Sequence, residues 1–425
     1  MPSRFHASLR IATAIAAAAL AFLPCARAAD ITVSDVTGPA DRTTVSFAAV
    51  RTDATPAARQ FLSVLRNDLA LSGWFLPTDL PSASVTLSGT VRGSSTGVSW
   101  SLDAIWNLRA STRSWSQSVS GTALRDAAHA LADEMIERIS GHPPMASSKI
   151  LCVGRRNNVT EIYECDADGQ RLRPITSDAK LCLSPNWNPG KYSFLYTSWI
   201  TGMPCVYEVD LAANPVRRRI VSNFPGMNNG AVLSPDGRRA AVILSRGGVD
   251  LYLIDPNARR ITDRLTRSRR ANESSPSWSP DGGSLVYVSD EGGTARCYVM
   301  NISTHRAARM SYSTEFGENV APEWGPDGRI AFCGRARNGR YRIFVVDGSS
   351  PSSLPKAVSP ADGFDYEDPS WAPDGRHIVC TRTAGYRRSL VVLDTKERGD
   401  PPRTLFSSEG DWYLPSWSDN GVARR

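Results

Sequence analysis

Few side chains in this chain of 425 residues have the type and spacing that catalysis requires. Residues 93–97 read Gly-Ser-Ser-Thr-Gly and match the Gly-x-Ser-x-Gly pattern of serine hydrolases. That pattern needs a strand-to-helix turn, whereas this stretch joins two expected strands. The five histidines lack metal-ligand spacing: His6, His129, His142, His305 and His377. We interpret the serine pattern as a chance match and expect no catalytic residue.

Two further patterns could hold a metal ion, and both are incomplete. Residues 166–169 read Asp-Ala-Asp-Gly, but Ser177 stands at the twelfth position, which a calcium loop fills with Glu, so we expect a tight turn. Seven cysteines lie mostly in apolar runs without a Cys-x-x-Cys pair: Cys152, Cys165, Cys182, Cys205, Cys297, Cys333 and Cys380. We expect them to be buried as small hydrophobic side chains, and we expect neither metal nor cofactor. Because their number is odd, at least one thiol lacks a partner within the chain, and any disulfide pairing stays open.

A repeat of about 46 residues dominates the second part of the chain. Its signature, Trp-Ser-Pro-Asp-Gly or a variant of it, begins at residues 187, 233, 278, 324, 371 and 417. Pro, Asp and Gly suit a tight turn, and short alternating apolar runs without helical period follow each signature. Four short strands per repeat are typical of a β-propeller blade, in which we expect the Trp to pack between neighbouring blades.

The two ends of the repeat region predict how the ring closes. Residues 149–176 have the later strands of a blade without its leading strand, and residues 415–417 have a leading strand alone. Joined, they make one complete blade. We therefore expect an all-β propeller of six blades over residues 149–425, closed by the C-terminal strand, which protects the sheet edges at the closure.

Residues 29–142 mix helix and strand patterns and predict an α+β domain. Thr55 suits a helix N-cap and Pro56 the first helical position, and apolar residues then recur at helical spacing up to Leu69. Three strand-like runs follow at residues 84–119, and a second helical pattern ends at Gly141. Residues 143–148, which begin with two prolines, are the expected linker to the propeller.

The first 28 residues resemble an export signal. Arg4 and Arg10 precede an apolar run at residues 11–23, and Ala26 and Ala28 supply the small residues that signal peptidase reads. The run is too short for a stable membrane anchor, which needs about 20 apolar residues. We expect cleavage after Ala28 and a soluble exported protein. Cys25 leaves a lipoprotein as the weaker alternative, because bulky residues precede it.

The charge balance gives no reason to expect a nucleic-acid partner. The chain has 49 Lys and Arg against 42 Asp and Glu, and three of the cations lie in the expected signal. The densest basic runs, residues 217–219 and 259–270, lie between apolar alternating segments. We interpret them as solvated strand edges that resist edge-to-edge pairing, with an acidic partner or an anionic lipid as the alternative.

A candidate binding site follows from the propeller itself, because the loops that enter the innermost strands converge on one rim of the central channel. These loops carry acidic, amide and aromatic groups, which suit a protein or peptide partner with basic residues. Some of these groups could instead cap strand ends. The predicted rim consists of Met227, Asn228, Asn229, Asn272, Glu273, Glu318, Asn319, Tyr366, Glu367, Asp411, Trp412 and Tyr413.

An exported α+β domain followed by six Trp-Ser-Pro-Asp-Gly blades resembles the TolB family, the periplasmic propeller proteins of the Tol–Pal system. The resemblance covers nearly all of the chain after the signal. Residues 67–75 look like the end of the family's first helix, and residues 226–229 look like its third-blade entrance. The family often has a His near Met227, and this sequence has none there.

The resemblance implies a non-enzymatic periplasmic adaptor. Its propeller mouth would bind the lipoprotein Pal and so associate peripherally with the outer membrane. Its mature N-terminus would bind the C-terminal domain of TolA. Such a protein supports outer-membrane integrity, protein import and constriction during cell division, and we expect a monomer.

The segment that would bind TolA contains Asp30, Ile31, Val33, Asp35 and Val36. A β-prone segment near a free terminus can add a strand to a partner's sheet, or it can be an edge strand of its own domain. Both states could alternate, docked when idle and released when bound.

Two other functions stay open on sequence grounds. The first is an exported propeller enzyme or sensor that binds a small molecule in the channel, which would need acidic pairs and histidines deep in that channel. The second is an envelope scaffold with other partners, since a propeller fold hosts many functions.

Overall fold

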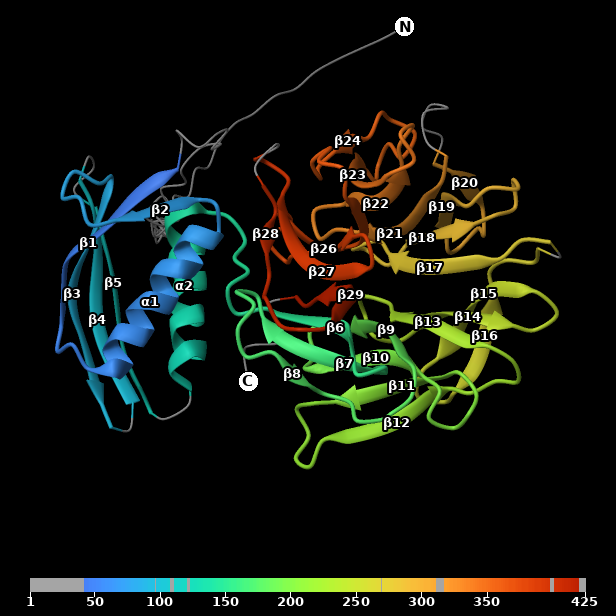
Figure 1. Cartoon of the computed structure of the whole chain (residues 1–425), viewed down its shortest axis with the longest axis horizontal. Coiled ribbons are helices and arrows are strands. Elements are labelled where there is room, and N and C mark those ends of the chain that lie inside the picture. The colour runs from blue at the N-terminus through green and yellow to red at the C-terminus, as the bar shows by residue number, and fades with distance from the viewer. Residues whose placement is uncertain are drawn as a thin grey trace, which may run out of the picture.

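The computed structural model of the protein describes residues 42–95, 97–107, 111–120, 123–268, 270–310, 317–397 and 401–419. The expected signal peptide and the candidate TolA-binding residues 30–36 lie outside the described residues. The chain forms an N-terminal α+β unit beside a six-bladed propeller, so the predicted fold class is confirmed (Figure 1).

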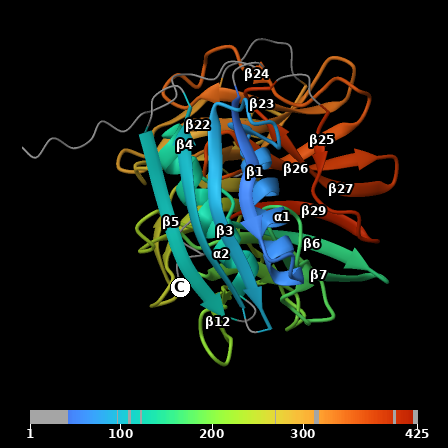
Figure 2. The same ribbon diagram turned by 90° about the vertical axis from the view of Figure 1, so that its left-hand side faces the viewer.

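One five-stranded sheet forms the frame of the N-terminal unit. Its strands lie in the order β2-β1-β3-β4-β5, with β1 parallel to both neighbours and β3, β4 and β5 antiparallel. The bounds are β1 Thr43–Thr52, β2 Phe75–Thr78, β3 Val85–Ser94, β4 Gly97–Trp106 and β5 Ser111–Ser120. One broad face of the sheet looks away from the propeller (Figure 2).

Two helices, α1 (Pro56–Leu71) and α2 (Leu124–Ser140), lie between the sheet and the propeller (Figure 1). The Thr55 hydroxyl accepts a hydrogen bond from the Ala58 amide, which confirms the predicted N-cap of α1. Gly141 ends α2 with a φ of 72°, a left-handed conformation that glycine adopts without strain. Apolar side chains of both helices and of the sheet form one core.

The propeller consists of six four-stranded sheets. Blade 1 is β29-β6-β7-β8, in which the C-terminal strand β29 pairs with β6 and closes the ring as predicted. The strands of this blade are β29 Asp411–Trp417, β6 Lys149–Arg156, β7 Val159–Asp166 and β8 Arg173–Pro174.

The other five blades follow in chain order, each from its innermost to its outermost strand. Blade 2 has β9 Cys182–Trp187, β10 Ser193–Ser198, β11 Cys205–Asp210 and β12 Arg217–Ser222, and blade 3 has β13 Asn228–Leu233, β14 Ala240–Ser245, β15 Val249–Asp255 and β16 Arg260–Arg264. Blade 4 has β17 Glu273–Trp278, β18 Ser284–Ser289, β19 Arg296–Asn301 and β20 Ala307–Arg309, and blade 5 has β21 Asn319–Trp324, β22 Arg329–Arg335, β23 Tyr341–Asp347 and β24 Lys356–Ala357. Blade 6 has β25 Asp365–Trp371, β26 His377–Ala384, β27 Arg387–Asp394 and β28 Arg403–Thr404.

The repeated Trp residues pack between blades, as predicted. Trp278 shares a core with side chains of blades 3 and 4, Trp371 with blades 5 and 6, and Trp417 with blades 6 and 1. All three indoles are buried. The seven cysteines are also buried, and none of them forms a disulfide, as expected for small hydrophobic side chains.

Candidate functional site

The central channel is lined by the innermost strands of the six blades. We call the end of the channel where these strands begin the entry mouth, and the opposite end the exit mouth. Each innermost strand is interrupted by a β-bulge in its pairing with the next strand. The bulged residues all have positive φ and recur at the repeat spacing: Ser184, Gly230, Ser275, Ala321, Asp368 and Leu414. Five of these are not glycine, so the repeat holds a conformation that costs free energy, as at many functional sites.

These bulges surround a cavity of about 290 Å³ inside the channel. Its described lining contains three carboxyl groups, Glu273, Glu323 and Asp368, and no histidine. Burial raises the pKa of Glu273 to about 7 and that of Glu323 to about 8, and it also raises the pKa of Asp368. The channel therefore holds acidic groups that ionise only partly near neutral pH.

Hydrogen bonds within and between blades hold Glu273 and Glu323 in place. The Ser370 hydroxyl donates to Glu323 Oε1 at 3.1 Å, and the same hydroxyl oxygen accepts from the Trp417 amide at 2.9 Å. In the same way, the backbone amide of Trp187 in blade 2 donates a hydrogen bond to the Ser416 hydroxyl in blade 1. At Glu273 the Ser289 hydroxyl donates to Oε1 at 3.3 Å, and Oε2 is buried without a hydrogen-bond partner. The arrangement fixes polar groups in the channel and offers no nucleophile activated by a base.

Three of the predicted rim residues line the cavity: Met227, Asn229 and Glu273. Asn229 lies opposite Ser184, with Oδ1 3.5 Å from the Ser184 hydroxyl. Residues of the innermost strands of blades 2, 3 and 4 thus meet at the channel, and the sequence named those of blades 3 and 4 but not Ser184 of blade 2.

Four further rim residues stand at the entry mouth and already have partners. Glu318 accepts a hydrogen bond from the Tyr341 hydroxyl at 2.5 Å, and Asp411 pairs with the Arg155 guanidinium at 2.5 Å. Glu367 accepts from the Thr383 hydroxyl at 3.2 Å. Asn272 is exposed and donates to Asp290 through its backbone and side-chain amides. The rim is therefore a mixture of acidic groups and arginines rather than an acidic surface.

The remaining five rim residues are not exposed contact groups. Asn228, Asn319, Tyr366 and Trp412 are each 2% exposed or less, and Arg388 covers the Tyr413 ring at 3.7 Å from its centroid. The prediction of exposed aromatic anchors at these positions is wrong. The physical reason is that alternate side chains of an innermost strand point into the cores between blades.

Two of these buried residues illustrate that structural role. The side-chain carbonyl of Asn228 accepts hydrogen bonds from the Ser222 hydroxyl at 2.6 Å and the Phe224 amide at 2.9 Å, so it closes the loop before β13. Trp412 packs edge-on against Tyr163, and its indole N–H donates to the Ser408 carbonyl at 3.0 Å.

Sequence reasoning missed the apolar part of the entry mouth. Tyr386 is 99% exposed in the β26–β27 turn, and Met203 and Ile200 are exposed in the β10–β11 loop. These loops lie at the entry mouth because antiparallel pairing places them beside the start of the innermost strands. The sequence Gly385-Tyr386 could have indicated an exposed aromatic side chain, because glycine is typical of a turn.

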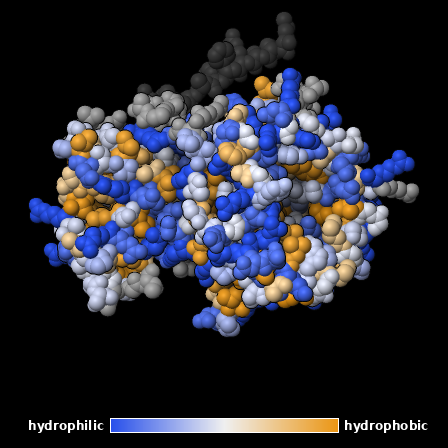
Figure 3. Space-filling model, viewed as in Figure 1, coloured by the Kyte–Doolittle hydropathy of each residue, from blue (hydrophilic) through white to orange (hydrophobic). Residues whose placement is uncertain are grey.

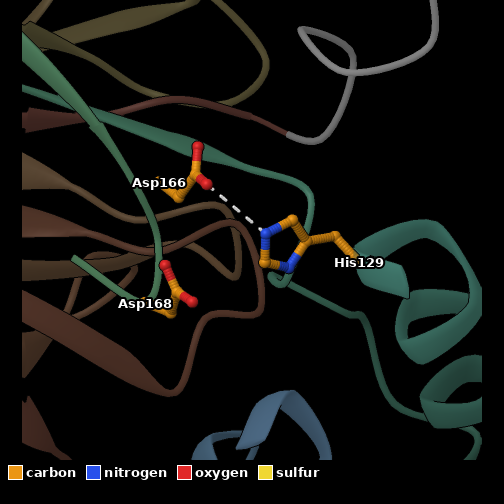
Figure 4. A group of neighbouring side chains, drawn as sticks. All are labelled: His129, Asp166 and Asp168. Carbon is orange, nitrogen blue, oxygen red and sulfur yellow. Dashed lines mark ion pairs between the residues drawn. The ribbon is translucent and has the colours of Figure 1, made fainter. Parts of the chain in front are cut away.

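A second cluster of polar side chains lies between the two structural units. His129 on α2 faces Asp166 and Asp168 at the end of β7, and candidate ligand atoms of the three residues lie within 4.8 Å of one another (Figure 4). Three cations compete for these carboxylates. Lys149 and Arg171 each pair with Asp166 at 2.7 Å, and Arg125 pairs with Asp168 at 2.5 Å. The donor set is therefore committed to ion pairs and does not fit a divalent metal ion.

The turn after β7 has the conformation that the sequence predicted. The Gly169 amide donates to the Asp166 carbonyl at 2.8 Å, and the Gln170 amide donates to the Asp168 carboxylate at 3.0 Å. Gly169 has a φ of 84° and lies against the Leu405 carbonyl. The tight turn thus presents both aspartates to α2.

Trp74 makes the other main contact between the units. Its ring stacks on His142 with centroids 3.6 Å apart, while Arg376 and Lys396 of blade 6 approach its ring within 4.5 Å. Arg376 also pairs with Asp394 at 2.6 Å. The N-terminal unit is thus fixed to blades 1 and 6 at the exit-mouth end, which leaves the entry mouth uncovered by it. No helix among the described residues is long and apolar enough to cross a membrane.

Comparisons with known proteins agree with this architecture. The model of the TolB beta propeller domain matches residues 136–420. Among curated proteins, the TolB homolog of Chlorobium luteolum is 28% identical over 43% of this chain and 40% of its own length. The Tol-Pal system protein TolB of Bordetella pertussis is 29% identical over 41% of this chain and 40% of its own length. The matches thus span about two fifths of these relatives.

A solved structure extends the likeness to both units. The crystal structure of TolB from Acinetobacter baumannii superposes with a TM-score of 0.77 at 21% sequence identity, covering 89% of this chain and 97% of that one. At this identity the likeness shows the fold. The family model, in contrast, covers more than half of the chain and includes all six signatures at the channel. The chain belongs to the TolB β-propeller family.

Proposed function

We propose that this chain is a non-enzymatic periplasmic adaptor of the Tol–Pal system that binds the lipoprotein Pal at the entry mouth of the propeller. Its association with the outer membrane would be peripheral and would pass through Pal. The chain would act as a monomer without nucleic acid or cofactor. The role would support outer-membrane integrity and constriction during division.

The observation that carries this proposal is the uncovered entry mouth. Exposed Tyr386 and Met203 lie at this mouth, as do the acidic residues Glu318 and Glu367, and the mouth leads into a channel with Glu273. Aromatic and Met side chains with a polar rim are typical of protein-binding surfaces. Such a surface fits a folded partner with basic and apolar groups better than a small molecule, because the cavity itself is small for a ligand pocket.

We further propose that the mature chain begins at Ala29 and that residues 30–36 bind the C-terminal domain of TolA. On this proposal the N-terminal unit occupies residues 29–142 and the propeller residues 149–425, with a short linker between them. The support is that Arg42, the first described residue, pairs with Glu397 of blade 6 and so lies at the junction of the two units.

Calorimetry with the soluble domain of Pal from the same organism tests the first proposal. The triple variant Glu273→Gln, Glu318→Gln and Glu367→Gln removes acidic charge with little change of shape, and we expect it to weaken binding about tenfold or more, as for interface charges. The matched control is Glu134→Gln on α2, which pairs with Arg138 in its own helix. Absence of binding to folded Pal, or equal losses in variant and control, would contradict the proposal.

A TolA pull-down tests the second proposal separately. Deletion of residues 30–36 should abolish binding to the TolA C-terminal domain and leave Pal binding intact. Retention of TolA binding after the deletion would contradict the proposed TolA-binding segment and would leave the proposed Pal site unaffected.

A further inference from the structure

The β11–β12 hairpin of blade 2 projects from the lower margin of the propeller (Figure 1). Its loop, residues 211–216, reads Leu-Ala-Ala-Asn-Pro-Val, and Val216 is 57% exposed. Three arginines, Arg217, Arg218 and Arg219, follow directly on β12. Charged residues alone are enough to keep an exposed edge strand from pairing with another strand. The exposed apolar tip beside these arginines therefore needs a separate explanation.

The three arginines differ in how their charges are used. Arg218 pairs with the buried Asp178 at 2.6 Å, and Arg219 pairs with Glu208 at 2.5 Å. Arg217 lies opposite Asp210 in the strand register, yet the two form no ion pair, and Asp210 instead accepts the Ala212 amide. Among the described residues Arg217 therefore has no ion-pair partner, and its positive charge lies next to the hairpin loop.

More cations surround this hairpin at the exit-mouth end of blades 2 and 3. The turns at that end carry exposed basic residues without an ion-pair partner in the described parts of the chain. Together with the hairpin arginines they form what we call the basic wall: Lys191, Arg217, Arg219, Arg238, Arg259 and Arg260.

Contacts between blades 2 and 3 show that the basic wall is continuous. Arg219 donates to the Pro256 carbonyl at 2.7 Å, which joins blade 2 to the turn that carries Arg259 and Arg260. A Cβ placed on Gly237 would lie 4.0 Å from Lys191 Nζ, so Lys191 adjoins the turn that carries Arg238. This margin has a mixed hydrophilic and hydrophobic surface (Figure 3).

Nearby acidic groups leave the wall net positive. Asp236 and Asp255 turn back to cap their own turns, accepting backbone amides at 3.0 and 2.9 Å. Over residues 182–264 there are ten Lys and Arg against six Asp and Glu. Asp236 and Asp255 are thus held against the backbone, while Lys191, Arg217, Arg238, Arg259 and Arg260 are exposed to solvent.

We propose that the basic wall and the β11–β12 hairpin bind the surface of a bilayer that contains anionic phospholipids. The cations would lie among the phosphate groups, and Val216 would enter the boundary between headgroups and acyl chains. Basic residues at an anionic membrane contribute additively, and a small apolar insertion adds to them. An acidic protein would satisfy the cations but would not account for the exposed apolar tip.

Co-sedimentation with lipid vesicles tests this proposal without Pal, so its outcome is independent of the proposed Pal site. The chain after residue 28 is mixed with vesicles of pure phosphatidylcholine or with 30% phosphatidylglycerol at low salt. We expect binding to the anionic vesicles only, and we expect 0.5 M NaCl to remove most of it because salt screens the cations.

Two sets of variants locate the site. Lys191→Glu with Arg217→Glu should lower the vesicle partition coefficient about tenfold or more. The matched control, Arg51→Glu with Arg92→Glu, makes the same charge change at exposed positions of the N-terminal sheet and should have little effect. Val216→Ser should weaken binding severalfold without changing its salt dependence, because it removes apolar contact alone.

Circular dichroism melts confirm that each variant is folded before binding is compared. Equal binding to neutral and anionic vesicles would overturn the proposal. So would equal losses in the basic-wall variant and the sheet control, which would show an effect of net charge instead of a site.

Discussion

His129 of the N-terminal unit faces Asp166 of the propeller, with Nε2 3.4 Å from Oδ2 and both side chains buried (Figure 4). On its other side, His129 Nδ1 lies 2.6 Å from Asp68 of α1. One imidazole thus joins both units through two carboxylates. Burial alone would lower the pKa of His129, but its bonds to Asp166 and Asp68 outweigh burial and raise the pKa to about 9.

The first prediction concerns the pH dependence of this junction. Because the folded pKa of His129 lies above the ordinary value of 6.5, its stabilisation is full below about pH 6.5 and is lost as the pH rises through 9. His129→Gln should therefore lower the free energy of unfolding by about 3 kcal/mol near pH 6, since it leaves the buried carboxyl group of Asp68 without its cationic partner. Urea unfolding at pH 6 and pH 10 measures the difference, which should shrink at the higher pH.

His305→Gln is the matched control for that change. His305 pairs with Asp263 at 2.8 Å, but its side chain is 40% exposed. An exposed pair contributes less than about 1 kcal/mol, so this variant should unfold almost like the natural chain. An equal effect of both histidine variants would contradict the role of burial at the junction.

The second prediction concerns Glu323 in the channel. Burial raises its pKa to about 8 from an ordinary 4.5, so its ionisation opposes folding increasingly as the pH rises from about 5 to 8. Glu323→Gln keeps an oxygen that accepts the Ser370 hydroxyl and removes the charge. We expect the variant to be more stable than the natural chain at pH 8.5, by on the order of 1 kcal/mol, and nearly equal to it at pH 5.

Denaturant midpoints at the two pH values check this expectation. Exposed Glu409→Gln serves as the control and should change neither midpoint. A Glu323 variant that is less stable at pH 8.5 would show that the charged form of this residue is needed in the channel.

The third prediction concerns ring closure. Trp417 on β29 is 5% exposed, and its indole N–H donates to the Ser148 hydroxyl at 2.7 Å. Trp417→Ala should cost about 3–5 kcal/mol, as expected for a large buried aromatic, and deletion of residues 414–425 should destabilise the whole ring. Thermal melts measure both effects, and Tyr386→Ala, which removes a fully exposed ring, should leave the melting temperature unchanged.

Much of this architecture could be predicted because it repeats in the sequence. The signatures beginning at residues 187, 233, 278, 324, 371 and 417 set the blade number and the strand order, and Trp278, Trp371 and Trp417 are buried between blades as predicted. Local chemistry likewise predicted the helix start at Thr55 and the helix end at Gly141, because each depends on neighbouring residues only.

The candidate site was less predictable because exposure depends on residues that are distant in sequence. Trp412 was expected at the surface, yet Tyr163 and Phe406 cover its ring. The link between His129 and Asp166 depends on how two separate units pack. Neither contact can be predicted from the spacing of nearby residues. The alternation of apolar and polar residues separates the two faces of a strand, but it does not tell which face a distant element covers.

Mapping where Pal contacts the propeller tests the proposed Pal site most directly. A photo-crosslinking residue is placed at Tyr386 or Met203 at the entry mouth, or at Leu354, which is 74% exposed in the loop after β23 at the exit-mouth end. Pal bound at the entry mouth should give adducts from Tyr386 and Met203 and none from Leu354. Adducts from Leu354 alone, with Pal binding intact, would contradict it.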